Sequence, residues 1–307
     1  MTLHIETPIY ENPDLNKRLN KRIFLKMECY QPVGSFKIRG IGALCEQAVA
    51  AGKTHLISSS GGNAGYAAAY AGKRLAVKVT VVVPQSTSDT AKERILGEDA
   101  EVIVKGAMWD GADSYARQLV EETGGAYIHP FDDARVWTGH ATMIDEAVRQ
   151  CPFKPDALAV CVGGGGLMSG IIEGMQRNNW QDVPVLALET EGADSFAQSI
   201  QAGDLVRLEQ ITSIATTLGA AQVTPKTMEW SQQHEIIPIV VSDRDAVSAC
   251  LQFADALRVL VEPSCGATLS LLYNQSHHLE NYESVLVIVC GGAGVTLAQL
   301  KAWDESL

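Results

Sequence analysis

Apolar segments alternate with helical segments along most of the sequence, and this alternation restricts the folds that are open to the chain. Residues 77–83, 157–162 and 285–290 are rich in valine and other apolar residues and are predicted strands. Residues 87–96 and 243–257 lie between such segments and are predicted helices. Strands that alternate with helices form parallel sheets. The alternation therefore predicts an α/β protein.

The predicted strands and helices form two sets, which divide near Trp137. We expect two open, twisted parallel sheets, in a small domain at residues 39–133 and a large domain formed by residues 1–38 and 134–307. A chain of 307 residues with 46% hydrophobic residues is long enough to bury a core in each domain. Ligands of such sheets bind beyond the carboxyl ends of the strands, so the turns that follow strands are the candidate sites.

The charge of the chain argues against two classes of partner. The formal net charge of −12 disfavours nucleic acid and anionic membrane surfaces. The N-terminus has no basic segment followed by an apolar one, so no signal peptide is expected. The longest uncharged apolar run, residues 157–172, is shorter than a membrane span, and no membrane partner is expected.

Seven cysteines are spread along the chain without any Cys-x-x-Cys pair. Several of them fall within apolar, strand-like segments. Such cysteines are typical of reduced thiols, and they predict a cytoplasmic protein. The seven positions are Cys29, Cys45, Cys151, Cys161, Cys250, Cys265 and Cys290.

A run of four glycines follows the predicted strand at 157–162, namely Gly163, Gly164, Gly165 and Gly166. Without side chains, their backbone N–H groups can approach an anion at the start of the next helix. Tight packing of the strand on the helix is the alternative, although four glycines exceed that need. A dinucleotide-binding fingerprint fits poorly, because Met168 stands where its third glycine belongs. The later glycine-rich turn has Leu297 at the same position.

Two further turns and one lysine are candidates for a functional site. The turn that begins at Ser60 and ends at Asn63 opens a helix and offers hydroxyl, amide and backbone donors, which suit either a carboxylate or a simple N-cap. The turn at Cys290 carries a thiol, which is a weak hydrogen-bond donor or acceptor. Considered without the other turns, Cys290 is a core residue. Lys37 lies between the glycine turn at Gly34 and a predicted helix at 38–51. In an apolar pocket its ammonium would lose a proton and become a usable amine, whereas the alternative is an ordinary surface lysine.

A lysine, an anion-binding glycine turn and a carboxylate-binding turn together fit an amino acid held on pyridoxal phosphate. The motifs that carry these groups also resemble the fold-type II pyridoxal-phosphate enzymes, and more closely the liver-type serine and threonine dehydratases. The likeness covers nearly the whole chain in the same order. It rests on residues 35–40, 60–65, 163–167 and 290–292, with support from 211–215 and 261–267. It implies two open α/β domains with the active site between them, and a homodimer.

The resemblance also implies roles for single residues. Lys37 would form the Schiff base with the cofactor, and Phe36 would cover one face of its ring. Asn63 would bind the phenolic oxygen. The remaining roles are a phosphate cradle of Gly163, Gly164, Gly165, Gly166 and Leu167, a thiol of Cys290 beside the pyridine nitrogen, and a substrate-carboxylate turn of Ser59, Ser60, Gly61 and Asn63.

The implied reaction is β-elimination from L-serine or L-threonine to pyruvate or 2-oxobutanoate and ammonia. Free Lys37 would remove the Cα proton as a general base, with Ser60 as a second catalytic residue. A neutral thiol at Cys290 makes the ring a weaker electron sink than an aspartate would, and this suits elimination. Three alternatives stay open, namely β-replacement of the cysteine-synthase type, racemisation, and a catalytically silent cofactor-binding protein.

The same family resemblance implies a monovalent cation site suited to K⁺, with Glu189 as the carboxylate ligand and the carbonyls of Ala193 and Leu218. A solvent-exposed glutamate at the end of a strand is the alternative. The chain also departs from the family at several positions, which leaves the identity of the substrate open. These departures are Thr217 for alanine or glycine, Val33 for serine, Gly61 for alanine, and Ala293-Gly294 for serine and asparagine.

Overall fold

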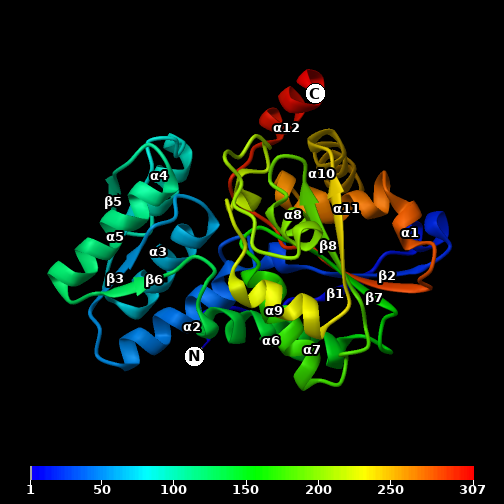
Figure 1. The fold of residues 1–307 in the computed structure, drawn as a ribbon, viewed down its shortest axis with the longest axis horizontal. Helices are drawn as coiled ribbons and strands as arrows, with labels where there is room; N and C mark the ends of the chain where they lie inside the picture. The colour runs from blue at the N-terminus through cyan, green and yellow to red at the C-terminus, as the bar shows by residue number, and fades with distance from the viewer. Residues whose placement is uncertain (1) are drawn as a thin grey trace. The chain divides into compact units, whose positions relative to one another are not determined.

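A computed structural model describes residues 2–307, and the chain in it divides into two compact units (Figure 1). Unit 1 contains the N-terminal segment up to Ile5 and Gln31–His140, and unit 2 contains Glu6–Tyr30 and Ala141–Leu307. These bounds differ from the predicted domain edges, because residues 2–5, 31–38 and 134–140, which were predicted to belong to the large domain, group with unit 1. Within unit 1, for example, Gly139 lies so close to the start of helix α2 (Lys37–Ala50) that an added Cβ would be 2.6 Å from the Arg39 oxygen.

Unit 1 contains a four-stranded sheet in the order β5-β4-β3-β6, and its strands are all parallel. The predicted α/β class is therefore confirmed in this unit. The register places Ser58 of β3 opposite Ile128 of β6, so the turns that follow these two strands lie side by side. The elements are α2, β3 (His55–Ser58), α3 (Asn63–Leu75), β4 (Lys78–Val83), α4 (Asp89–Leu96), β5 (Glu101–Val104), α5 (Trp109–Thr123), β6 (Ala126–Ile128) and the start of α6 (Ala134–Gln150).

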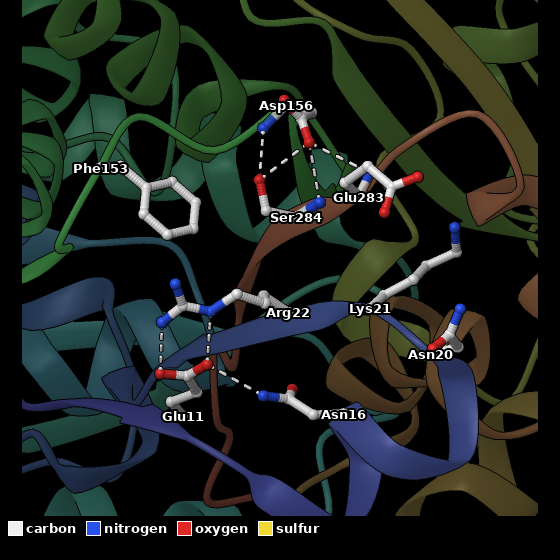
Figure 2. A pocket seen from close by; sticks show the side chains of 9 residues that line it. All are labelled: Glu11, Asn16, Asn20, Lys21, Arg22, Phe153, Asp156, Glu283 and Ser284. Atoms are coloured by element: carbon white, nitrogen blue, oxygen red, sulfur yellow. Dashed lines mark hydrogen bonds and ion pairs between the residues drawn. The ribbon is translucent and has the colours of Figure 1, made fainter.

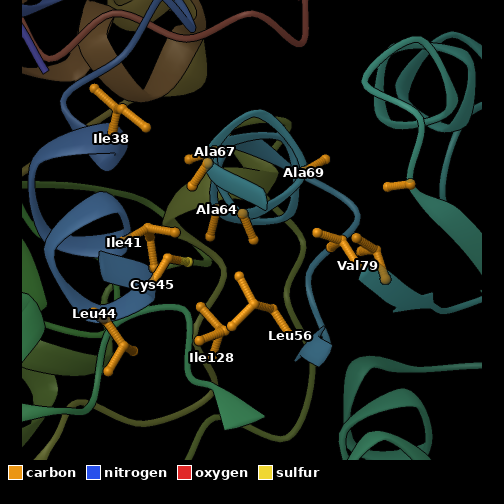
Figure 3. Packing of buried hydrophobic residues seen from close by; sticks show 14 of the residues in the cluster. Ile38, Ile41, Leu44, Cys45, Leu56, Ala64, Ala67, Ala69, Val79 and Ile128 are labelled. Atoms are coloured by element: carbon orange, nitrogen blue, oxygen red, sulfur yellow. The ribbon is translucent and has the colours of Figure 1, made fainter. Parts of the chain in front are cut away.

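The alternation of side chains along the strands of unit 1 covers both faces of its sheet. Leu56 and Val81 belong to a cluster with residues of α2 and α3, whereas the neighbouring Ile57 and Val82 pack with alanines of α5. Figure 3 shows the first cluster, in which Ile38 of α2 and the alanines of α3 gather above Leu56 and Ile128. The small alanines let α3 lie close to its neighbours, and this packing fixes the starts of α2 and α3.

Unit 2 contains a six-stranded sheet in the order β1-β2-β10-β7-β8-β9. Strand β1 pairs antiparallel with β2, and the other pairs are parallel. The strands are β1 (Ile9–Glu11), β2 (Arg22–Lys26), β7 (Ala157–Cys161), β8 (Val185–Thr190), β9 (Ile236–Val241) and β10 (Ser284–Ile288). The helices are α1 (Pro13–Leu19), α7 (Gly166–Arg177), α8 (Ser195–Ala202), α9 (Pro225–Gln233), α10 (Asp243–Leu257), α11 (Pro263–Tyr273) and α12 (Leu297–Ser306), with 3-10 turns at Glu28–Tyr30, Thr216–Leu218 and Ser276–Leu279.

A buried ion pair joins β2 to the end of α6 in unit 2. Lys26 Nζ lies 2.6 Å from Glu146 Oε2, and the Lys26 side chain is fully buried. Lys26 also donates to the carbonyl of Thr7 and to the side chain of Gln150. Among residues 2–307, no helix is long and apolar enough to cross a membrane.

Candidate functional site

Lys37 is the first residue of α2 and follows a tight turn in unit 1. Gly34 has a φ of 71°, and its N–H donates to the carbonyl of Gln31, so this turn uses the left-handed conformation that glycine tolerates best. The Lys37 ammonium lies 5.2 Å from the centre of the Phe36 ring and donates to the carbonyl of Pro130 at 2.8 Å. Lys37 is therefore held at the carboxyl end of the sheet, beside the segment that follows β6.

His140 lies behind Phe36 and supports it. The two rings are 4.9 Å apart, and His140 is fully buried. Burial, and then the positive charges of Lys37 and Arg39, lower the pKa of His140 well below its usual range, so the imidazole is neutral. Neither ring nitrogen has a hydrogen-bond partner within residues 2–307. A bulky, neutral ring here fixes the orientation of Phe36, the residue next to Lys37.

The turn from Ser60 to Asn63 is shaped by two close approaches of the backbone. A Cβ at Gly65 would lie 1.7 Å from the carbonyl oxygen of Ser60, and a Cβ at Gly61 would lie 2.4 Å from Thr87 Oγ1. The N–H of Gly62 donates to Ser60 Oγ at 3.3 Å, which leaves the Ser60 hydroxyl proton available to another acceptor. The turn then enters α3, whose N-cap Gly62 has no capping side chain. Hydroxyl and amide donors thus gather at the start of a helix, as the predicted carboxylate site requires.

The structure brings the predicted residues of unit 1 to one edge of its sheet. The turn at Ser60 follows β3, and Pro130, which holds Lys37, follows the adjacent strand β6. Ile38 and Ala64, the residues after Lys37 and Asn63, belong to the same buried cluster. The lysine and the carboxylate turn are therefore fixed by one piece of core.

The tetraglycine turn lies between β7 and α7 in unit 2. Gly165 is the N-cap of α7 with a φ of 87°, and a Cβ there would lie 1.9 Å from Thr227 Oγ1. A Cβ at Gly163 would lie 3.1 Å from the Cα of Leu218. No side chain caps the amide groups at the start of α7. Uncapped N–H groups on a backbone without side chains fit a phosphate group, so this turn is suited to the phosphate of pyridoxal phosphate.

Cys290 lies next to the tetraglycine turn, because β10 and β7 are neighbouring parallel strands. Its sulfur lies 3.5 Å from the sulfur of Cys161. Hydrogen bonds with Cys161 and Cys265, together with burial, raise the pKa of Cys290 well above its ordinary value. Cys290 is therefore a neutral thiol, as the sequence argument about the ring nitrogen assumes.

Glu189 is the penultimate residue of β8, the neighbour of β7 on the side away from β10. Its Oε1 accepts from the N–H of Phe196 at 2.9 Å and its Oε2 from the N–H of Ala197 at 2.8 Å, so it caps the start of α8. Burial raises the pKa of Glu189 to about 8 in spite of these two bonds. Ala193 forms a bridge with Thr190 on the same loop, and Leu218 lies against Gly163. The three predicted cation ligands thus lie near the same edge of the unit 2 sheet, and the solvent-exposed alternative does not apply to Glu189, which is fully buried.

Thr217, which departs from the family pattern, is hydrogen-bonded to a buried carboxylate other than Glu189. Its hydroxyl donates to Glu262 Oε1 at 2.6 Å and contacts the hydroxyl of Ser264. Glu262 also fills the space beside Gly292, where an added Cβ would lie 2.0 Å from its Cδ. Glu262 was not predicted as a site residue, because an N-cap glutamate before Pro263 gives little local signal.

Other contributors were also missed, because they act through contacts between distant parts of the chain. Thr227 of α9 shapes the tetraglycine turn, and Pro130 binds Lys37. Asp113 of α5 and Tyr127 of β6 hold Ser59. The Thr224-Pro225 pair is a recognisable helix start, and it was the one available signal for α9.

A surface pocket of about 560 Å³ lies away from the predicted site residues of unit 2, at the amino ends of its parallel strands β2, β7 and β10 (Figure 2). Four of its charged side chains are engaged with one another, with Ser284 or with backbone. Arg22 forms a two-point ion pair with Glu11, and Asp156 accepts from the hydroxyl and the N–H of Ser284. Lys21 donates to the carbonyl of Tyr282. The predicted site residues of unit 2 lie at the opposite, carboxyl ends of its parallel strands.

The chain is similar to known proteins along nearly its whole length. The family model described as "Pyridoxal-phosphate dependent enzyme" matches residues 1–291. The L-serine dehydratase of Dictyostelium discoideum is 45% identical over 99% of this chain and 93% of its own length. The human L-serine dehydratase/L-threonine deaminase is 44% identical over 99% of this chain and 96% of its own. The crystal structure of a fungal L-serine ammonia-lyase from Rhizomucor miehei superposes with a TM-score of 0.94, at 39% identity and 99% coverage of both chains.

Proposed function

The chain belongs to the family of pyridoxal-phosphate dependent enzymes, and from this membership we propose that it deaminates L-serine, L-threonine or both by β-elimination. The β-hydroxyl group leaves as water, and a water molecule is consumed again when hydrolysis releases the ammonia. The products would be ammonia with pyruvate from serine or with 2-oxobutanoate from threonine. The observation that carries the proposal is the likeness, over 99% of both chains, to an L-serine ammonia-lyase. The lysine, the carboxylate turn and the phosphate-fitting turn support it.

The residues of unit 1 would hold the substrate and move its proton. Bound pyridoxal phosphate withdraws electrons from the substrate α-carbon and makes its proton removable. Lys37 Nζ would hold the cofactor aldehyde in the resting enzyme and take that proton during the reaction. The carbonyl of Pro130, which accepts from Lys37 Nζ at 2.8 Å, would orient the amine while it is free. Ser60 and the amide groups before Asn63 would bind the substrate carboxylate.

The residues of unit 2 would hold the cofactor. Gly163, Gly164, Gly165, Gly166 and Leu167 would bind its phosphate through backbone N–H groups, and Cys290 would lie at the pyridine nitrogen. Asn63 and Phe36 of unit 1 would contact the phenolic oxygen and one face of the ring. As a further part of the proposal, Glu189, Ala193 and Leu218 would bind K⁺. A homodimer in the cytoplasm is proposed as well, the location being supported by seven free cysteines.

Product analysis tests the reaction type. Purified protein with pyridoxal phosphate is incubated with L-serine and with L-threonine, in the presence and absence of sulfide, and the 2-oxo acid, cysteine and D-serine are measured. We expect 2-oxo acid and an equal amount of ammonia, with or without sulfide. Cysteine formed at the expense of pyruvate would favour β-replacement, D-serine as main product would favour racemisation, and no product would favour a silent binding protein.

Replacing the lysine tests the covalent link. In Lys37→Ala we expect the absorbance band of lysine-bound cofactor to disappear and 2-oxo acid formation to fall by at least about 1,000-fold, because both the anchor and the base are lost. The unfolding midpoint should change little, since Lys37 is partly exposed at a helix start. Borohydride trapping and peptide mapping provide the measurement. A label on another lysine of the wild-type protein would contradict the assignment.

A further inference from the structure

A hydrogen-bonded cluster of unit 1 lies directly beneath the carboxylate turn. Ser59 Oγ donates to Asp113 Oδ1 at 2.9 Å and lies 2.9 Å from the hydroxyl of Tyr127. The Tyr127 hydroxyl also donates to the same Asp113 oxygen. Ser59 is fully buried at the end of β3, so its hydroxyl points into the protein. Three elements, β3, α5 and β6, therefore meet at this one hydroxyl.

The number of protons in the cluster determines what Ser59 can do. An ionised Asp113 carboxylate only accepts, and its Oδ1 receives one proton from Ser59 and one from Tyr127. A serine hydroxyl has a single proton, so Ser59 has none left for a bound carboxylate. The hydroxyl of Ser60 and the amide groups of the turn remain as donors. Ser59 is thus placed to anchor the turn rather than to touch the substrate.

The Asp113 carboxylate is itself held in place and kept charged. Arg117, one helical turn further along α5, donates from Nε to Asp113 Oδ2 at 2.8 Å and lies 4.3 Å from the centre of the Tyr127 ring. Burial acts to raise the pKa of Asp113, but the hydrogen bonds from Tyr127, Arg117 and Ser59 outweigh it and hold this pKa below its ordinary value. Asp113 is therefore a fixed, ionised acceptor on a 15-residue helix.

We propose that Asp113 and Tyr127 are positioning residues, which fix the turn from Ser60 to Asn63 in the conformation that binds the substrate α-carboxylate. The inference rests on the proposed function, because that function assigns the carboxylate to this turn. Ser60 follows Ser59 directly, and the Gly65 contact ties its carbonyl to α3. Rotation of Ser59 would therefore move the Ser60 hydroxyl and the amide groups together. Preorganised donors of this kind raise affinity for an anion without touching it.

The test compares two ligands that differ only in the carboxylate. L-Alanine has no leaving group at Cβ, and L-alaninamide lacks the charged carboxylate as well. Each is titrated into the cofactor-loaded protein, and the change in cofactor absorbance gives the dissociation constant. For Asp113→Asn and Tyr127→Phe we expect the affinity for L-alanine to fall by about tenfold, and that for L-alaninamide to change by less than about twofold. Glu121→Gln, an exposed carboxylate on the same helix, is the matched control and should change neither value.

Two further measurements separate this inference from the proposed function. Amide hydrogen exchange of residues 60–63 in cofactor-free protein should be faster in Asp113→Asn and Tyr127→Phe than in the wild type, whether or not the enzyme is a dehydratase. Ser59→Ala should give the same ligand discrimination, and adding it to Asp113→Asn should have little further effect. Equal losses for both ligands, no losses, unchanged exchange or additive effects would each overturn the positioning role. A wild-type protein that binds no cofactor would instead overturn the proposed function.

Discussion

The tetraglycine turn of unit 2 is shaped by a residue that lies far along the chain. Four consecutive glycines predict that another group, from the protein or a ligand, approaches the backbone closely. Only the structure shows that at Gly165 the approaching group is the side chain of Thr227, a residue of α9 that lies 62 positions later in the chain. The role of the phosphate turn stays a prediction, and the contact supplies a way to test it.

Gly165→Ala should weaken cofactor binding at the residue that shapes the cradle. The φ of 87° disfavours any side chain by about 1–3 kcal/mol, and the new Cβ would lie 1.9 Å from Thr227 Oγ1, so the turn must shift. We expect at least about a tenfold loss of affinity for pyridoxal phosphate, measured by absorbance titration. Gly203→Ala is the matched control, because Gly203 has a φ of 70° with no atom within 4 Å of the new Cβ. Gly203→Ala should lower the free energy of unfolding without changing cofactor affinity. An equal loss of cofactor affinity in both variants would contradict the explanation by the Thr227 contact.

At the scale of elements, regular periodicity decided what could be predicted. Helices with one buried face, such as α2 and α10, were predicted close to their observed bounds. Helix α11 was not predicted, because the chain buries Pro263 and the nine residues after it on all sides, so no polar face marks the helical period. The start of α6 is not marked by the apolar pattern either. Ala134 begins this helix because the side chain of Asp133 accepts from the N–H of Arg135, a capping contact that the apolar pattern does not report.

The junction of β8 with α8 should make stability depend on pH. Burial raises the pKa of Glu189 to about 8 in the folded protein, above the ordinary 4.5. The native state therefore binds the extra proton between these values, and the stabilisation it gives is complete below about pH 4.5 and is lost as pH rises through about 8. In urea titrations without K⁺, the free energy of unfolding of the wild type should fall by a few kcal/mol relative to Glu189→Gln between pH 5 and 9.

Potassium should reverse this loss if Glu189, Ala193 and Leu218 bind it. A bound cation stabilises the ionised carboxylate, so adding K⁺ at pH 8–9 should raise the unfolding free energy of the wild type but not of Glu189→Gln. Tetramethylammonium at equal ionic strength is the control, since it is too large for such a cage. A response that is the same in both proteins, or the same for both cations, would argue against the cation site.

At the scale of the whole molecule, the α/β class and the two units followed from the order of strands and helices, whereas the cofactor family followed from Lys37, two turns and the resemblance that these motifs carry. These features depend on local sequence and on the parallel pairing that it implies. The contacts that complete the site depend instead on distant pairs. Ser59 meets residues 54 and 68 positions away, and their identity leaves no local pattern. The edge strand β1 and its neighbour β2 were missed as well, because strands of three and five residues are too short to show a clear pattern.

The distribution of thiols offers a test of the packed molecule as a whole. All seven cysteines are free, and six of them are buried, with Cys29 as the exception. Burial also raises the pKa of Cys151, to about 11, and the pKa values of Cys29 and Cys250, which keeps these thiols protonated and slow to react. A chromogenic thiol reagent should therefore label at most one cysteine rapidly in the native protein, none in Cys29→Ala, and all seven in denaturant. Five reactive thiols in denaturant without reductant would mean that one pair of cysteines had oxidised to a disulfide. Cys161 and Cys290 are candidates for that pair, because their sulfur atoms lie 3.5 Å apart. Rapid labelling of several thiols in the native protein would contradict the packing of both units.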